Sequence, residues 1–175
     1  MFWSNPANWP NSVLPGEDEI VEIPKGRTMI LDIPETPIFK NLQINGVLRF
    51  KQGMDIHLRS KIIFVRAGEL QIGTEAVPFT NKATITLFGD SESEPMAWSN
   101  SVEGGNKMIA NVGKISMFGK QRMKMSRLRT PAKKGDTKIF VEDGLDWLSG
   151  DKIAVASTSY NHEGAEEFVI QSYNF

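Results

Sequence analysis

Apolar and polar residues alternate over short stretches of this chain, and three of these stretches share one pattern. A glycine is followed by any residue and then by apolar, polar and apolar residues at Gly46–Phe50, Gly68–Ile72 and Gly113–Met117. The first two glycines lie 22 residues apart, and the second and third lie 45 apart, about twice that step. Alternation at every second residue predicts β-strands. The regular step predicts stacked coils of similar length.

Further short apolar runs, rich in β-branched residues and bounded by Gly, Pro or Asn, also predict strands. They are Ile20–Ile23, Met29–Ile33, Leu42–Ile44, Ile62–Val65 and Ile85–Phe88, and, nearer the C-terminus, Lys138–Val141, a strand directly after Gly150–Asp151, and Glu167–Ile170. No stretch sustains the i, i+3, i+4, i+7 spacing of a helix. We therefore predict an all-β protein, a right-handed parallel β-helix-like solenoid of short strands punctuated by glycines. A β-sandwich is the alternative, because strands and turns at intervals of about 8 to 12 residues also occur.

Length and composition indicate the size of the fold and exclude several classes of protein. The 175 residues suffice for one domain with a real core. The chain has no cysteine, which excludes a disulfide framework and thiolate metal sites. No apolar run has the length of a membrane helix, and Met1–Pro6 lacks the basic and apolar regions of a signal peptide. A net charge of −1 gives no overall attraction to nucleic acid or to an anionic membrane.

Charge is nevertheless unevenly distributed along the chain. Residues 104–135 carry nine basic residues and no acidic one, whereas residues 136–175 carry eight acidic and two basic residues. In an extended strand Arg122 and Lys124 share one face, while Met123 and Met125 form a buried row on the other. We predict that this basic face binds a polyanion, through Lys120, Arg122, Lys124, Arg127 and Arg129.

A solvated face is the alternative interpretation of the same cations, which would then pair with Glu163, Glu166 and Glu167 in a neighbouring coil. No aromatic residue lies within 119–139 to stack on bases, which argues against nucleic acid as the polyanion. Among the four tryptophans, Trp98 lies in the polar, glycine-rich stretch 90–106, which predicts a long loop between coils. Trp98 is therefore the candidate for stacking on a sugar ring, whereas Trp9 and Trp147 are expected in the core.

The sequence predicts no catalytic residue. Glu166 and Glu167 are adjacent, and a strand directs neighbours to opposite faces, so only one could enter a given cleft. Hydrolysis of a glycosidic bond by paired carboxylates needs a second one from elsewhere.

No cofactor or metal site is predicted either. His57 alternates with apolar residues and is expected to point outward from a strand, far along the chain from His162. A calcium ion held by Asp143, Asp146 and Asp151 is the alternative, although no Asp-x-Asp-x-Asp-Gly loop occurs.

The run from Trp3 to Gly119 resembles the G8 domain, a glycine-rich extracellular module. The segments that carry the resemblance are residues 3–23, 31–50, 64–79 and 83–90. Residues 146–160 and 165–170 resemble the first coils of the β-helix that follows this domain in larger proteins. We therefore expect residues 1–122 to form a G8-type β domain. Residues 123–175 are expected to be the first coils of that β-helix, packed on the domain as one unit and continuing in a longer parent chain.

The resemblance also implies a setting and a function. It implies an extracellular or cell-surface location and a larger parent protein that can be anchored in a membrane. We expect a non-catalytic module for adhesion, or for binding a matrix component or an anionic glycan such as hyaluronan. The alternatives are the N-terminal part of a larger hyaluronidase-like enzyme that degrades polysaccharides, and a structural spacer of a surface or ciliary assembly. No catalytic residue of the family carries over to this sequence.

Overall fold

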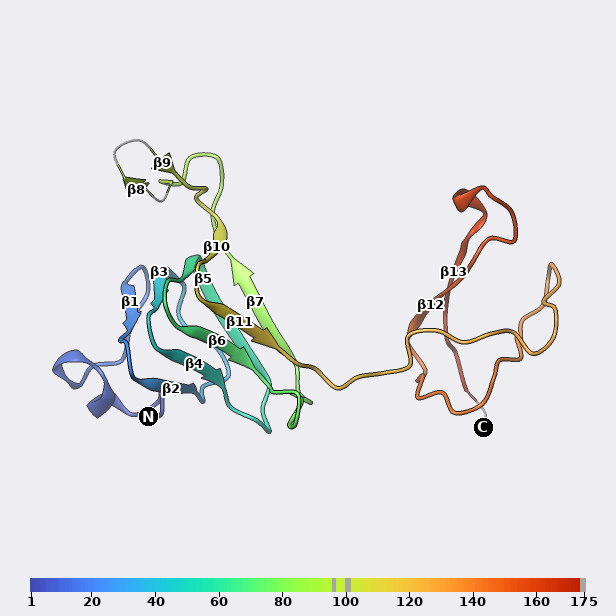
Figure 1. Cartoon of the computed structure of the whole chain (residues 1–175), viewed down its shortest axis with the longest axis horizontal. Helices are drawn as coiled ribbons and strands as arrows, with labels where there is room; N and C mark the ends of the chain where they lie inside the picture. Colours follow the sequence, from blue (N-terminus) through green and yellow to red (C-terminus); the bar gives the residue numbers. More distant parts are fainter. Residues whose placement is uncertain (96, 100–101, 174–175) are drawn as a thin grey trace. The chain divides into compact units, whose positions relative to one another are not determined.

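The computed structural model of the chain describes residues 1–95, 97–99 and 102–173 (Figure 1). These residues form two compact units, Met1–Lys120 and Gln121–Phe175. The boundary after Lys120 lies close to the division after residue 122 that the sequence predicts. The packing of the two units as one body stays a prediction.

Short strands make up most of the N-terminal unit, which begins with the 3₁₀ turns η1 (Pro6–Asn8) and η2 (Pro10–Ser12). The strands are β1 (Ile20–Ile23), β2 (Thr28–Leu31), β3 (Phe39–Ile44), β4 (Val47–Phe50), β5 (Ile56–Val65), β6 (Glu69–Ile72), β7 (Ala83–Leu87), β8 (Ala97–Ser99), β9 (Val102–Glu103), β10 (Met108–Asn111) and β11 (Lys114–Met117). Every strand predicted in this part of the sequence is present.

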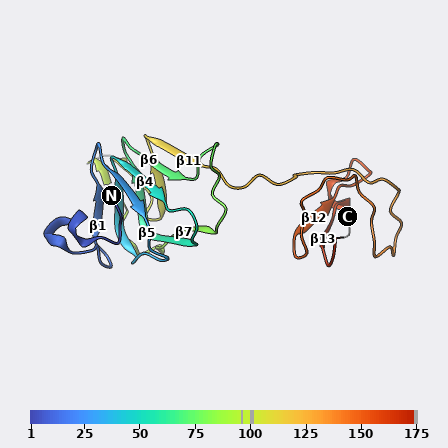
Figure 2. The same cartoon turned by 90° about the horizontal axis from the view of Figure 1, so that it is seen from below.

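Successive strands alternate between two sheets. One sheet has the order β1, β3, β5, β10, with β7 also pairing with β5, and the other has the order β2, β4, β6, β11. All pairs within these two sheets are parallel. Figure 2 shows the two sets of strands as two layers. The predictions of an all-β protein and of parallel strands are confirmed, whereas immunoglobulin-type sandwiches are antiparallel.

An insertion accounts for the long step between the second and third glycines. The first half of β5 pairs with β7 and its second half pairs with β10, so β7 and β10 together occupy one position in the stack. The predicted loop separates them and contains the antiparallel hairpin of β8 and β9. Because β11 pairs directly with β6, the distance from Gly68 to Gly113 spans a single coil plus the insertion. The expectation of coils of similar length is therefore wrong at this position.

The core lies between the two sheets and is sealed at its first coil. Leu42 pairs in register with Ile63, and Leu48 with Leu70, and all four side chains have no solvent exposure. At the first coil, Trp9 donates a 2.8 Å hydrogen bond from its indole to the carbonyl oxygen of Trp3, whose ring lies 5.6 Å from that of Phe39. Trp3 and Trp9 are both buried, which confirms the core position predicted for Trp9.

The three glycines of the repeated pattern mark the corner where the chain passes from one sheet to the other. Glu69 N donates to Gly46 O at 2.8 Å, and Lys114 N donates to Gly68 O at 2.9 Å. A Cβ atom on Gly68 would lie 1.8 Å from Gly46 O, and one on Gly113 would lie 2.5 Å from Gly68 O. Distances below 3.0 Å are not tolerated there, because backbone atoms cannot move aside as a side chain can. Glycine at these corners is what lets successive coils stack.

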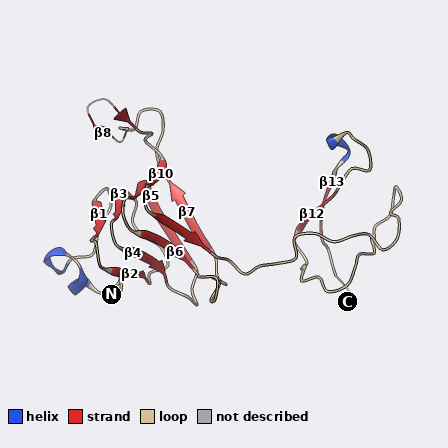
Figure 3. Cartoon of the chain, in the orientation of Figure 1, coloured by secondary structure: helices blue, strands red, loops and turns tan. Residues whose placement is uncertain are grey.

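The C-terminal unit differs in construction (Figure 3). Its strands β12 (Lys152–Val155) and β13 (Glu166–Val169) pair antiparallel and are joined through the 3₁₀ turn η3 (His162–Gly164). This pairing differs from the parallel stacking expected of β-helix coils. The strand predicted at Lys138–Val141 does not form, since only Val141 makes a bridge, to Leu128. Leu145 is the one buried apolar side chain among the described residues of this unit.

Replacing Gly68 with alanine tests the corner. The added methyl group would push two backbone segments apart, and we expect the free energy of unfolding to fall by about 3 kcal/mol or more. Chemical denaturation of the full chain measures this loss. Gly105→Ala is the matched control, because a Cβ atom there meets nothing within 4 Å. We expect the control to change stability by less than about 0.5 kcal/mol, and equal losses in the two variants would contradict the account.

Candidate functional site

The basic segment, which we define as Lys120–Arg129, has a different local structure from the one the sequence predicts. Residues 120–127 form no strand. Met123 is 50% exposed and Met125 is 79% exposed, so the predicted buried row of methionines is wrong. Alternating side chains are buried only where neighbouring strands provide a sheet face, and this segment has no strand partner before Leu128 in the described residues.

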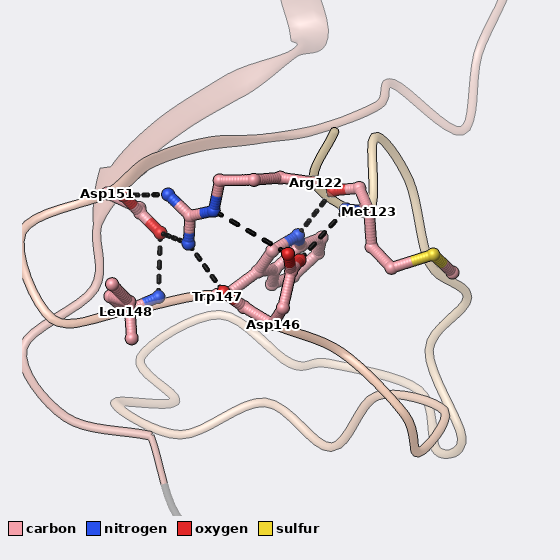
Figure 4. A network of polar contacts seen from close by, with 6 residues as sticks. All are labelled: Arg122, Met123, Asp146, Trp147, Leu148 and Asp151. Atoms are coloured by element: carbon pink, nitrogen blue, oxygen red, sulfur yellow. Dashed lines mark hydrogen bonds and ion pairs between the residues drawn. The ribbon is translucent and has the colours of Figure 1, made fainter. Parts of the chain in front are cut away.

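Arg122 binds two aspartates of a later loop (Figure 4). Its Nη1 and Nη2 atoms donate to Oδ1 and Oδ2 of Asp151 at 2.9 and 2.6 Å, a bidentate contact. Nη2 also donates to the carbonyl oxygen of Asp146 at 2.5 Å, and Nε lies 3.8 Å from the Asp146 carboxylate. Two parallel charged hydrogen bonds fix both position and orientation of a guanidinium group. Arg122 is therefore held within the fold.

Backbone groups complete this network. Asp146 Oδ1 accepts a hydrogen bond from Met123 N at 2.8 Å, and the indole of Trp147 donates to Met123 O at 2.7 Å. Asp151 Oδ2 also accepts from Leu148 N at 2.6 Å, which closes the turn before β12. Trp147 is half-buried, not a full core residue as predicted. The network joins the start of the basic segment to the loop that contains Asp146 and Asp151.

The contact between Arg122 and Asp151 shifts the pKa of both groups. The hydrogen bond from Arg122, followed by that from the Leu148 amide, lowers the pKa of Asp151 below its ordinary value of 3.8. The same hydrogen bond, in which Asp151 is the acceptor, raises the pKa of Arg122 above its already high ordinary value. Both groups are consequently charged at neutral pH, and the positive charge of Arg122 is already balanced within the chain.

Arg129 is also paired, with Asp143. Its backbone amide donates to Phe140 O at 2.8 Å, which holds the end of the basic segment beside the loop of Asp143. The two arginines thus pair with aspartates at 143, 146 and 151, and not with the glutamates named by the alternative interpretation. Those glutamates, Glu163, Glu166 and Glu167, are exposed and have no ion pair among the described residues.

Three of the five predicted binding residues have no carboxylate partner among the described residues. They are exposed and lie between or beside the two paired arginines: Lys120, Lys124 and Arg127. Lys124 also borders a cavity of about 660 Å³ that opens between the basic segment and β12. The lining is mostly apolar and includes Met123, Met125 and Ile153, with Arg122 and Lys152 as further cations.

The remaining candidates are placed as follows. Trp98 lies in β8, and its side chain falls outside the described residues. His57 points outward from β5, as predicted, and its Nε2 atom lies 2.7 Å from Thr86 Oγ1. Within the described part of the chain, no three His, Cys, Asp or Glu residues cluster to hold a metal. The calcium hypothesis is untested, but its three carboxylates each already have an arginine neighbour.

Sequence reasoning missed that Asp146 and Asp151 are the partners of Arg122. It placed Asp151 at the turn directly before a strand, which is where Asp151 lies. The available signal was the asymmetry of charge, a run without acids followed directly by a run with few bases. Such a signal predicts pairing between the runs but does not identify the pairs.

A model of the G8 domain matches residues 8–129, a range that includes all five predicted cations. The chain belongs to the G8 domain family. No solved structure matches it.

Individual G8 proteins are similar over nearly the whole chain. Human fibrocystin-L is 34% identical over 94% of this chain, and dog fibrocystin is 33% identical over 89%. Communication mutant protein F of Dictyostelium discoideum is 26% identical over 92%. The chain spans only 4% of the length of the two fibrocystin relatives and 15% of the third. In the described residues, no helix has the length and apolar character needed to cross a membrane.

The pH dependence of the Arg122 network can be predicted in sign. Because the folded-state pKa of Asp151 is lowered, the contact contributes above the ordinary aspartate pKa and is lost as pH falls through the lowered value. We expect the indole N–H resonance of Trp147 to stay constant from neutral pH down to that region, then to shift with a midpoint below 3.8. An NMR titration measures the midpoint, and Asp151→Asn should remove the transition. A midpoint above 3.8 would show that the pair does not form.

Proposed function

We propose that this chain is a non-catalytic extracellular or cell-surface module that binds an anionic polysaccharide through Lys120, Lys124 and Arg127. The observation that carries the proposal is the surplus of unpaired positive charge. Of the nine bases within residues 104–135, three are paired with acids, Lys114, Arg122 and Arg129, which leaves six without an ion-pair partner among the described residues.

The paired and unpaired cations have different roles in this proposal. Arg122 and Arg129 hold the basic segment on the loops that follow it, and so act as positioning residues. Lys120, Lys124 and Arg127 keep their charges in solvent, where each can meet a carboxylate or sulfate group. A linear polyanion gains affinity by making several such contacts at once. Added salt lowers this affinity, because it screens exposed charges.

The fold fits an extended binding surface. We propose that the N-terminal unit is a short right-handed β-helix-like solenoid, a geometry supported by the alternation of its strands between two parallel sheets. Repeat scaffolds of this kind carry binding residues on their faces and loops while the core stays apolar. Of the three proposed binding residues, Lys120 is the last residue of this unit, and Lys124 and Arg127 belong to the C-terminal unit.

A structural spacer is the second candidate, and the arginine pairs favour it. If Arg122 and Arg129 served only to join loops, the neighbouring lysines would be an ordinary solvated surface. The enzyme alternative has less support, because the cavity beside the basic segment has one carboxylate in its lining, Asp151, and that group is paired. Glycoside hydrolysis by paired carboxylates needs two.

Binding of the full chain to heparin and to hyaluronan at rising salt tests the proposal. We expect measurable affinity at low salt that falls as salt is added. The variant with Lys120→Gln, Lys124→Gln and Arg127→Gln should bind about 10- to 100-fold more weakly, because three exposed contacts of roughly 0.5 to 1 kcal/mol each are lost.

A matched variant separates a defined site from net charge. Lys25→Gln, Arg66→Gln and Lys82→Gln together remove the same charge from exposed positions elsewhere, and we expect them to leave the affinity within about threefold of wild type. Equal losses in the two variants would show that only net charge matters. Absence of binding to either glycan at low salt would leave the spacer as the better account.

A further inference from the structure

The first glycine corner contains a pair of residues with an intrinsic chemical reactivity. Asn45 directly precedes Gly46, and this is the only Asn-Gly pair in the sequence. The side-chain amide of an asparagine can react with the backbone amide of the next residue. Glycine in that position hinders the reaction least, because it has no Cβ and leaves the backbone free to turn. An unfolded chain would therefore lose this asparagine first.

The reaction is deamidation through a succinimide ring. The amide nitrogen of Gly46 loses its proton and attacks Cγ of Asn45, so that a C–N bond forms. The bond from Cγ to Nδ2 breaks, and Nδ2 takes up a proton and leaves as ammonia. Water then opens the ring. Opening at the side-chain carbonyl gives aspartate, and opening at the main-chain carbonyl gives isoaspartate. The reaction consumes only solvent water and requires no enzyme.

In the closed corner both reacting groups are hydrogen-bonded to β1. Gly46 N donates to Ile23 O at 2.9 Å, so the proton that must be lost is held in a hydrogen bond. Asn45 Nδ2 donates to Glu22 Oε1 at 2.8 Å, and Asn45 N donates to Ile23 O at 3.0 Å. Attack requires the Gly46 amide to leave Ile23 and Cγ of Asn45 to turn toward it. The closed corner opposes both movements.

Packing around Gly46 also opposes the rotation that the reaction needs. Gly46 is buried, and a Cβ atom there would lie 2.3 Å from the carbonyl oxygens of both Pro24 and Arg27 in the preceding coil. On the side of the following coil, Gly46 O accepts a hydrogen bond from Glu69 N at 2.8 Å. The backbone at this point touches the coils before and after it. It can turn only when the coils separate locally, as buried groups become reactive through local opening.

We propose that Asn45 is a deamidation site which the closed first corner protects, and that its conversion makes an opening of this corner permanent. Isoaspartate adds a carbon atom to the main chain, which displaces Gly46 from its space between the coils. Aspartate keeps the length of the main chain but places a second carboxylate beside Glu22 and removes the hydrogen bond between the two side chains. Neither product rebuilds the original corner. All the groups involved belong to the N-terminal unit, and the proposal does not depend on glycan binding.

Rates of deamidation with and without the corner test the protection. The full chain and a synthetic peptide of residues 41–50 are incubated in the same mildly alkaline buffer, which favours loss of the amide proton. Peptide mapping by mass spectrometry measures the conversion of Asn45. We expect the full chain to react at least about tenfold more slowly, because only its small open fraction is reactive. Equal rates in the chain and the peptide would overturn the proposal.

A variant of Glu22 tests the contact that holds the asparagine side chain. Glu22→Ala removes the acceptor, and we expect conversion in the full chain to rise about three- to tenfold, the effect of one lost hydrogen bond. Glu75→Ala is the matched control, since it removes the same charge from an exposed position elsewhere in this unit. The control should leave the rate unchanged. An unchanged rate in Glu22→Ala, or equal rises in both variants, would contradict the protection by Glu22.

Asn45→Asp reproduces the aspartate product and tests its effect on the corner. We expect the equilibrium constant for unfolding at neutral pH to rise about fivefold, because a hydrogen bond is lost and two carboxylates become neighbours. Chemical denaturation measures this constant. Adding Glu22→Gln should recover most of the loss, since the glutamine amide can donate to the new carboxylate. An equal rise with glutamate and with glutamine at position 22 would overturn the proposed effect of conversion.

Discussion

Close contact of stacked backbones at three glycines is the constraint on which the N-terminal unit depends. At each corner a glycine faces a carbonyl oxygen of the preceding coil at a distance that leaves no room for a side chain. At the second and third corners the next residue, Glu69 or Lys114, then donates to the carbonyl oxygen of the glycine below it, and at the first corner Val47 N donates to Arg27 O, so the corner also sets the register of both sheets. The rows of buried leucine and isoleucine follow from that register. One repeated pattern thus encodes both the corner and the core.

A second constraint organises the basic segment. Positive charges that are crowded without acids repel one another, and the fold relieves this repulsion at Arg122 and Arg129 by pairing them with aspartates that follow in the sequence. Lys124 and Arg127, which lie between them, stay in solvent. The same segment therefore contains cations that shape the chain and cations available to a partner, and a binding experiment must alter the two kinds separately.

Much of the strand pattern of the N-terminal unit could be predicted from the sequence, because alternation reports burial on a sheet face. Ile20–Ile23 and the three glycine-led segments are examples. The insertion between β7 and β10 could not be predicted from spacing, since an added loop lengthens a repeat without changing the pairing of its strands. The prediction of a buried methionine row was wrong for a related reason. Alternation at Met123 and Met125 predicts burial only where neighbouring strands form a sheet around these residues. The partners of Arg122 depend on tertiary contacts that local pattern does not contain.

Backbone contacts between successive coils test the central claim most directly. In solution, NMR should show cross-strand contacts between β3 and β5, with Leu42 beside Ile63, and between β4 and β6, with Leu48 beside Leu70. It should also show the amide of Glu69 close to Gly46, as the corner requires. Antiparallel contacts between strands adjacent in sequence, such as β3 with β4, would contradict the stacking of coils on glycine corners.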